Sequence, residues 1–489
     1  MIKLYNSLTR KLENFIPIHT PKVGMYTCGP TVYSYASIGN FRTYTLSDLL
    51  LRVLQNNGFQ VTYIMNFTDV GHLSGDNLGD ADTGEDRMAQ SAAKEHRSMW
   101  DIADGYIEAF KGDFNDLNLV TPTKFVRATD HVKEQIDLAQ ALDERGYLYR
   151  TSDGMYFDTS KFTPRDRLST LDAKGIRPGA RVKLSPEKKN PTDFAIWKFA
   201  SNDRQEMTWD SPWGKGFPGW HLECSAMSMK YLGETFDLHL GGEDLASTHH
   251  PNEIIQSEAV TGKLFVKYWI HGAFMLVDGG RMGKSLGNAY TIGDVKEKGF
   301  NPLALRYLYL TAHYRDQLNF TWQSLQGAQT ALEKLYDFVV KFRHSPGAQR
   351  TVLSEEKLAK VNQFSLRFNA AIENDLGFPQ AMAVLWSMIK SNIPSEDKYD
   401  LLLDFDRVLG LKLAEAKPKE LQELPKEIAD MVAQRRQFRE QGRWLEADII
   451  RKDINKAGFE VKDSTSGTQV EKIVSPKTVG KGRYFKGKS

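Results

Sequence analysis

Four side chains in this sequence of 489 residues could together bind a metal ion. Cys28 and Cys224 are its two cysteines, and His249 and Glu253 follow in the segment THHPNE. Zn²⁺ accepts sulfur, nitrogen and oxygen ligands, so the four residues could form one tetrahedral site. Their spacing alone favours two unrelated core cysteines, because free Cys is among the most buried residue types.

Two glycine-containing loops could bind phosphate groups. The segment Ser37–Asn40 (SIGN) precedes a predicted helix, and a helix N-terminus offers free N–H groups and a positive dipole end to an anion. The loop Asp278–Asn288 has four glycines together with Arg281 and Lys284, so it is flexible and cationic. Each loop alone is common in α/β proteins or in surface hairpins, so neither decides a function.

The elements around the first loop predict a parallel α/β sheet. Val23–Thr27 is expected to be a strand, Asn40–Asn57 a helix with apolar residues at helical spacing, and Val61–Asn66 the next strand. Such a strand–helix–strand unit builds parallel sheets. A second α/β half is expected to add three strands, at Phe194–Phe199, Phe236–His239 and Tyr268–Gly272.

Composition is that of an ordinary globular protein, with 41% hydrophobic and 26% charged residues and a net charge of +2. No apolar run is long enough to cross a bilayer, and the N-terminal segment lacks the apolar core of a signal peptide. With two cysteines and no such signal, we expect a cytoplasmic protein without a membrane partner. A monomer is expected as well, although the sequence does not report the oligomeric state. The tail 476–489 has five basic residues and no acidic residue, which would add non-specific attraction to phosphates.

Taken together, ten ordered segments resemble the cysteinyl-tRNA synthetases, a family of class I aminoacyl-tRNA synthetases. They are YTCGPTVY at 26–33, NFTDVGH at 66–72, RATDHV at 127–132, DFAIWKFA at 193–200, SPWGKGFPGWHLECSAM at 211–227, HLGGEDL at 239–245, HHPNEIIQSEA at 249–259, RMGKSLGN at 281–288, NDLGFPQAM at 374–382 and RWLEADIIRKDI at 443–454. The resemblance runs through nearly the whole chain. It implies activation of L-cysteine with ATP and Mg²⁺, and transfer of cysteine to the 3′ end of cysteine tRNA.

The resemblance also implies a domain plan. A Rossmann-like catalytic domain is expected to be interrupted by an α/β module and followed by a helical bundle and a small anticodon-binding domain. The expected ranges are 1–125 and 193–275 for the catalytic halves, 126–192 for the inserted module, 276–323 for a stem-contact region with the Lys284 loop, 324–416 for the bundle, 417–475 for the anticodon-binding domain and 476–489 for the basic tail.

By the same resemblance, the four residues named first bind one Zn²⁺ per chain. The metal would select the substrate, because a thiolate bonds Zn²⁺ directly and a serine hydroxyl is a poor ligand. Shape alone separates such near-isosteres by only about 10–200-fold. His221 and Glu223 flank Cys224 and are expected to support the ligands. Pro251 is expected to push His250 out of helical geometry, which leaves His250 less suited to bind the metal.

The ATP site implied by the resemblance contains both class I signatures, at Ser37–Asn40 and Arg281–Ser285. Lys284 is expected to stabilise charge on the phosphates as the adenylate forms, with Ser37 and Asn40 as further catalytic residues. Ser37 stands where the family usually has histidine, and a hydroxyl cannot carry a positive charge, so Arg42 or His72 could compensate. The full expected ATP-binding set is Ser37, Gly39, Asn40, Gly241, Gly242, Asp244, Arg281 and Lys284.

The remaining implied sites are a cysteine pocket and an anticodon surface. The pocket residues are Gly29, Thr31, Thr68, Trp220 and His239, and core packing is an alternative role for Trp220. Unstacked anticodon bases can stack on aromatic and Arg side chains. The anticodon candidates are Arg435, Arg436, Arg439, Arg443 and Trp444.

Two other functions stay open at this point. A ligase that joins activated cysteine to an amino sugar would need the same zinc and phosphate loops, but the C-terminal segment 425–465 speaks against it. An RNA-binding paralogue that has lost catalysis would explain Ser37 and Gly283. The retained metal ligands and Lys284 speak against that paralogue.

Overall fold

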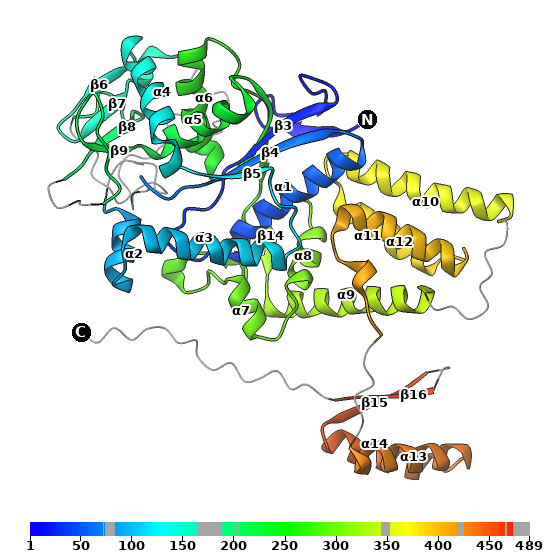
Figure 1. The fold of residues 1–489 in the computed structure, drawn as a ribbon. Helices are drawn as coiled ribbons and strands as arrows, with labels where there is room; N and C mark the ends of the chain where they lie inside the picture. Colours follow the sequence, from blue (N-terminus) through cyan, green and yellow to red (C-terminus); the bar gives the residue numbers. More distant parts are fainter. Residues whose placement is uncertain are drawn as a thin grey trace. The chain divides into compact units, whose positions relative to one another are not determined.

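The computed structural model describes residues 1–71, 73, 84–163, 168, 187–201, 204, 206–343, 353–418, 425–464 and 467–472 (Figure 1). The chain forms two compact units, Met1–Lys417 and Pro418–Ser489. His72 and the tail 476–489 lie outside the described residues, and so do the roles predicted for them. No helix among the described residues is both long enough and apolar enough to span a bilayer.

A five-stranded parallel sheet forms the centre of the first unit and confirms the predicted Rossmann-like architecture. Its strands, in spatial order, are β11 (Val266–Gly272), β10 (Phe236–Gly242), β3 (Lys22–Thr27), β4 (Gln60–Phe67) and β5 (Lys124–Arg127). The strand order reverses between β3 and β10, and open α/β sheets bind ligands at the carboxyl ends of the strands at such a point. Cys28 follows β3 directly.

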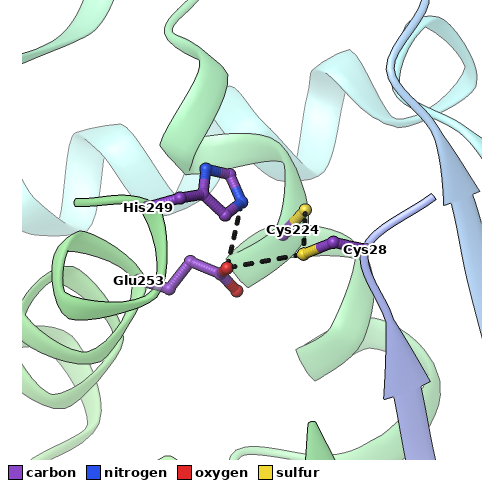
Figure 2. Close-up of side chains that lie close together, drawn as sticks. All are labelled: Cys28, Cys224, His249 and Glu253. Atoms are coloured by element: carbon purple, nitrogen blue, oxygen red, sulfur yellow. Dashed lines mark hydrogen bonds and ion pairs between the residues drawn. The ribbon is translucent and has the colours of Figure 1, made fainter. Parts of the chain in front are cut away.

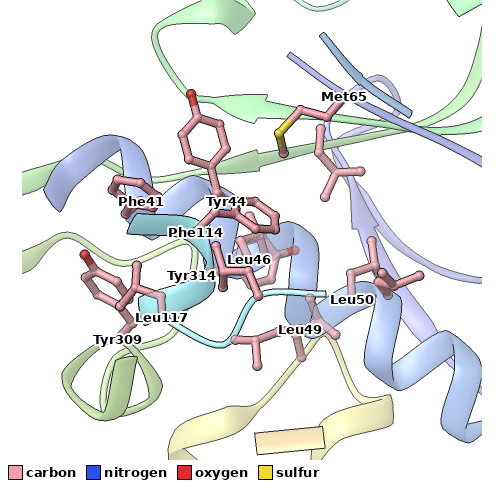
Figure 3. Packing of buried hydrophobic residues seen from close by; sticks show 14 of the residues in the cluster. Phe41, Tyr44, Leu46, Leu49, Leu50, Met65, Phe114, Leu117, Tyr309 and Tyr314 are labelled. Atoms are coloured by element: carbon pink, nitrogen blue, oxygen red, sulfur yellow. The ribbon is translucent and has the colours of Figure 1, made fainter. Parts of the chain in front are cut away.

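Helix α1 (Ile38–Asn56) connects β3 to β4 and begins two residues before the predicted start. The earlier start results from a capping box, in which Ser37 accepts the Asn40 N–H and the Asn40 side chain accepts the Ser37 N–H. Along the helix, apolar residues at helical spacing are buried. Figure 3 shows Phe41 and Tyr44 of α1 packed in the same core as Phe114.

The inserted module has an antiparallel sheet of its own. Its strands are β6 (Leu148–Arg150), β7 (Gly154–Phe157), β8 (Phe194–Phe199) and β9 (Gly216–Pro218), and helix α4 (Val132–Glu144) precedes them. The prediction that Phe194–Phe199 belongs to the second half of the parallel sheet was therefore wrong. An apolar run shows that a strand is buried, but it does not show which sheet the strand joins.

The other elements of the first unit surround these sheets. They are β1 (Lys3–Asn6), β2 (Lys11–Asn14), α2 (Arg87–Glu95), α3 (Met99–Asp116), α5 (Trp220–Leu232), α6 (His249–Thr261), β12 (Met275–Val277), β13 (Gly280–Arg281), β14 (Leu318–Phe320), α7 (Ile292–Glu297) and α8 (Pro302–Leu310). The predicted helical region follows as α9 (Trp322–Arg343), α10 (Glu355–Glu373), α11 (Phe378–Lys390) and α12 (Ser395–Leu409). Its apolar stripes are buried, as expected for a helix bundle.

A buried ion pair joins α1 to α8. Arg306 Nη2 lies 2.5 Å from Asp48 Oδ2, and the two side chains are 0% and 1% exposed. Arg306 also donates to the backbone carbonyls of Leu409 and Leu117. The guanidinium of Arg306, on α8, therefore contacts both α1 and the C-terminal end of α12.

Replacing Arg306 with leucine is expected to lower the free energy of unfolding by about 3–5 kcal/mol. The buried Asp48 carboxylate would keep only Arg52, 2.9 Å away, as a cation, and the carbonyls of Leu409 and Leu117 would lose their donor. Urea denaturation followed by circular dichroism measures the change. The double variant with Asp48→Asn should recover part of the loss, and an unchanged unfolding midpoint for the single variant would contradict the prediction.

The second unit contains two helices and a hairpin. The elements are α13 (Lys426–Glu440), α14 (Trp444–Lys456), β15 (Phe459–Ser464) and β16 (Gly467–Lys472). Ile428, Ile454 and Val461 form its buried core.

Candidate functional site

A cavity of about 210 Å³ opens at the reversal point of the parallel sheet. Residues that follow β3, the first turns of α1 and residues after β10 line it together with Lys284. The lining includes these predicted site residues: Cys28, Gly29, Thr31, Asn40, Thr68, Trp220, Cys224, Gly242, Asp244, His249 and Lys284. Segments that are remote in sequence thus meet around one space.

The four candidate metal ligands converge at the floor of this cavity (Figure 2). Cys28 Sγ lies 3.6 Å from Cys224 Sγ and 3.8 Å from Glu253 Oε1. His249 Nε2 lies 3.0 Å from Glu253 Oε1. Ligand atoms around a tetrahedral Zn²⁺ are about 3.3–3.8 Å apart, given metal–ligand bonds of about 2.0–2.3 Å. The two separations from Cys28 Sγ lie in this range, and the His249–Glu253 separation is shorter by a few tenths of an ångström. The donor set therefore fits a tetrahedral metal ion after a small side-chain movement.

A second set of donors overlaps the first. Cys28 and Glu253 also lie close to the imidazoles of His239 and His250, and these four donor atoms are within 4.8 Å of one another. Cys28, Cys224 and His249 line the cavity, whereas His239 and His250 are fully buried and do not. A metal that binds a substrate needs an open position, so access favours the first set.

The charged side chains of this cluster shift one another's pKa values strongly. Burial by itself would raise the pKa of Glu253, but the His239 and His249 rings hold it at about 2. Burial would lower the pKa of His249, but the Glu253 carboxylate and the Cys224 sulfur raise it to about 10. Burial would raise the pKa of Cys224, but a hydrogen bond from Cys28 and the charge of His249 lower it to about 6. Burial raises the pKa of Cys28. The cluster holds two anions that a divalent cation would also neutralise.

The ring of His249 is fixed by its neighbours. His249 Nδ1 lies 3.0 Å from His221 Nδ1, on the side away from Glu253. The Trp220 ring centroid is 4.4 Å from that of His249. His221 therefore contacts the ring nitrogen that a metal would leave free, which is where second-shell partners of a histidine ligand lie.

Helix α6 begins at His249, so the expectation that Pro251 pushes His250 out of helical geometry was wrong. Proline is accommodated in a first helical turn, where its missing N–H has no intrahelical partner to lose. In this turn, His250 Nε2 lies 3.5 Å from Cys28 Sγ, and its other nitrogen lies 2.7 Å from His271 Nε2. His250 is thus a buried neighbour of the candidate metal site, and this position was missed because Pro251 was expected to break the turn.

Close backbone packing builds the rest of the wall. A Cβ on Gly29 would lie 1.7 Å from the carbonyl oxygen of Asn66, so only glycine fits after Cys28. Asn66 accepts the Gly29 N–H and donates to the Thr68 hydroxyl. Thr31 pairs with Thr68 in an isolated β-bridge. The two threonines predicted for the substrate pocket are therefore side by side.

The two predicted signature loops also meet. Ile38 N–H donates to the Tyr290 carbonyl, and Ser37 pairs with Thr291 just after the second loop. A Cβ on Gly39 would lie 3.1 Å from the sulfur of Met282. The N-terminus of α1 and the cationic loop therefore border the same end of the cavity, as phosphate binding would require.

Comparison with known proteins agrees with this geometry. The family model for the class I (C) tRNA synthetase catalytic domain matches residues 14–330. The chain belongs to this family. It is 45% identical over 471 residues to cysteine–tRNA ligase 1 of Burkholderia lata, covering 96% of each chain. It is 39% identical to the cysteine–tRNA ligase of Treponema denticola, covering 96% of this chain and all of the relative.

Solved class I synthetases share the fold. A leucyl-tRNA synthetase of Agrobacterium radiobacter, in complex with tRNA, matches with a TM-score of 0.57 at 12% identity, over 81% of this chain and 84% of that one. Methionyl-tRNA synthetase of Mycobacterium tuberculosis matches with a TM-score of 0.52 at 13% identity, over 80% of this chain and 90% of that one. At these identities the likeness concerns the fold alone.

Two contacts of Lys284 in this synthetase were not expected from the sequence. Its ammonium group donates to the Ser34 hydroxyl and lies 3.3 Å from the Tyr33 hydroxyl. It also lies 4.4 Å from the centre of the Tyr33 ring. Tyr33 is the last residue of the quoted motif YTCGPTVY and Ser34 follows it, but sequence spacing does not reveal a contact across 250 residues.

Several predicted site residues do not line the cavity. Ser37, Gly39 and Gly241 are sequence neighbours of lining residues, and Arg281 lies in β13. Glu253 and His239 are buried and paired at 2.9 Å. Glu223 is buried against the backbone of Gly71. Their roles in the family's reaction stay predictions.

Arg42 does not supply the charge that Ser37 lacks. Its guanidinium is buried and donates to the carbonyls of Ala273, Phe274, His313 and Asp316. Arg42 therefore holds together the loops around β12 and β14.

Ser37→Ala is expected to lower the free energy of unfolding by about 1 kcal/mol, because it removes the N-cap of α1. Urea denaturation measures the change. Ser98→Ala is a matched control, because Ser98 caps α3 in the same way, outside the cavity lining. The two variants should lose similar stability, and an unchanged Ser37→Ala protein would refute the capping role.

Proposed function

We propose that this protein is a cysteine–tRNA ligase that activates L-cysteine with ATP and transfers it to the 3′ end of cysteine tRNA. One observation carries the proposal. In a chain of this family, two cysteines, a histidine and a glutamate meet at a cavity that Lys284 and the first turn of α1 also line.

The candidate metal site would recognise the substrate. Cys28, Cys224, His249 and Glu253 would hold Zn²⁺, and the bound ion would supply a Lewis acid that prefers a thiolate to a hydroxyl. Glu253 is the ligand without access to the cavity, and it is anchored by His239. Thr31, Thr68 and Trp220 line the space above the metal set, where the amino and carboxylate groups of cysteine would be oriented.

The other end of the cavity would bind ATP with its Mg²⁺. The N-terminus of α1 would present its positive dipole end to phosphate oxygens. Its Ile38 and Asn40 N–H groups already donate to the Tyr290 carbonyl and the Ser37 hydroxyl. Gly242 and Asp244, after β10, would face the adenosine. As the cysteine carboxylate attacks the α-phosphate and pyrophosphate leaves, Lys284 would stabilise the developing negative charge. A ribose hydroxyl of the terminal tRNA adenosine would then attack the carbonyl of the adenylate and release AMP.

We propose that the second unit binds the anticodon. Trp444 is 60% exposed, with the Arg439 guanidinium 5.7 Å from its ring, so both could stack on an unpaired base. Arg443 lies over Phe438, and Arg436 pairs with Glu440 at the surface. Arg435 is 3% exposed and belongs to the core, so it is removed from the anticodon candidates. The ranges predicted for the catalytic halves, the inserted module, the stem-contact region and the helical bundle stay predictions.

The test is ATP–pyrophosphate exchange with cysteine in zinc-replete buffer, followed by charging of cysteine tRNA. Both activities are expected, and serine in place of cysteine should support neither. Exchange with an amino-sugar acceptor but no charging of tRNA would favour the amino-sugar ligase. Binding of tRNA without any exchange would favour an inactive paralogue.

A further inference from the structure

Tyr33 lies at the end of the cavity that the phosphates would occupy, and two cations meet on its side chain. Lys284 Nζ lies 3.3 Å from the Tyr33 hydroxyl. From α2, Arg87 Nη1 lies 3.4 Å from the same hydroxyl, and the Arg87 guanidinium carbon lies 5.3 Å from the ring centre. One phenol therefore holds an ammonium and a guanidinium next to each other.

Two like charges that bond the same oxygen repel each other, and a multiply charged anion beside them turns that repulsion into binding. The triphosphate of ATP is the most highly charged small anion of the proposed reaction. A guanidinium presents its N–H groups in a planar fork that can bond two phosphate oxygens at once, which the point charge of lysine cannot do.

The position of Arg87 is held from several sides. Asp86 caps α2, and Arg204 Nη1 lies 2.5 Å from Asp86 Oδ2, with 10% and 9% of the two side chains exposed. Ser91, one turn further along α2, donates to the Tyr33 carbonyl at 2.8 Å. Arg87 Nε donates to the Leu73 carbonyl at 3.3 Å. Helix α2 thus fixes both the backbone and the hydroxyl of Tyr33.

At the N-terminus of α1, the residue in the signature position supplies no cation for the phosphates. Ser37 has no charge, and its hydroxyl is used in the capping box of α1. Arg42 is committed to four backbone carbonyls elsewhere. We propose that Arg87 binds the β- and γ-phosphates of ATP beside Lys284. The Tyr33 hydroxyl, which contacts both cations, would hold them in position. This inference rests on the proposed function, because it assigns the triphosphate to that end of the cavity.

The experiment measures binding of inorganic tripolyphosphate with Mg²⁺ by calorimetry, with AMP as the comparison. Arg87→Ala is expected to weaken tripolyphosphate binding by about tenfold or more, the loss of a charge-assisted hydrogen bond, and to leave AMP binding unchanged. Arg87→Lys should recover part of the affinity. Lys94→Ala is the matched control, since it removes a positive charge from the exposed end of the same helix and should change nothing.

In pyrophosphate exchange, Arg87→Ala should raise the KM for ATP and leave the KM for cysteine unchanged. An Arg87→Ala protein with normal thermal stability and unchanged tripolyphosphate affinity would overturn the inference. So would a double-variant cycle in which Arg87→Ala has no further effect in a Tyr33→Phe background, because Arg87 would then act only through Tyr33.

If Arg87→Ala does not fold, Arg87→Lys and Arg87→Gln provide the same comparison. Tripolyphosphate binding needs neither cysteine nor zinc. A wild-type protein that binds tripolyphosphate through Arg87 but shows no cysteine-dependent exchange would refute the proposed function and leave this inference standing.

Discussion

Cys224→Ala is expected to remove the bound zinc and, with it, cysteine-dependent pyrophosphate exchange. The substitution removes one of the two thiolates of the proposed set, and Cys28 and His249 would already be used as ligands in that set. The rate should fall by more than the roughly 10–100-fold that the loss of an outer-shell partner costs. Zinc content by atomic emission and the exchange assay measure the two effects.

His250→Asn is the control that separates the two overlapping sets of donors. If Cys28, Cys224, His249 and Glu253 hold the metal, this variant should keep about one zinc per chain while Cys224→Ala keeps none. The opposite pattern, with zinc retained in Cys224→Ala and lost in His250→Asn, would place the metal on the buried set with His239. In that case the ion could not reach a substrate in the cavity.

Lys284→Ala is expected to slow formation of cysteinyl-adenylate by about 10²–10³-fold, which corresponds to about 2.7–4 kcal/mol of transition-state stabilisation. The lysine is held by Tyr33 and Ser34 at the edge of the cavity. In the proposed function, charge on the leaving pyrophosphate would develop there. Single-turnover kinetics with cysteine and ATP measure the step.

Zinc content should be unchanged in Lys284→Ala, since the lysine does not contact the metal set. Transfer of cysteine from isolated adenylate to tRNA should be affected much less than adenylate formation. An equal loss in both steps would mean that Lys284 supports the structure of the site rather than the charge of the first transition state.

The four candidate ligands were predicted from the resemblance of ten segments to one family, because their spacing alone favoured two unrelated core cysteines. Local patterns place some of these residues in the fold. Cys28 comes at the end of an apolar strand and before a glycine, which places it at the carboxyl edge of a parallel sheet. His249 and Glu253 are four residues apart, which places them on one face of a helix. The helix that begins at Ile38 was predicted to within two residues, because its apolar spacing is a local signal.

Contacts between distant segments were decided only by the tertiary structure. The sheet to which Phe194–Phe199 belongs depends on which strand edges are free, and the sequence of the strand does not specify this. The bond between Lys284 and Ser34 and the approach of Arg87 to Tyr33 arise where loops from three parts of the chain pack together. Residue types and local spacing thus determine the chemistry that is available, whereas close packing of remote segments determines which groups act together.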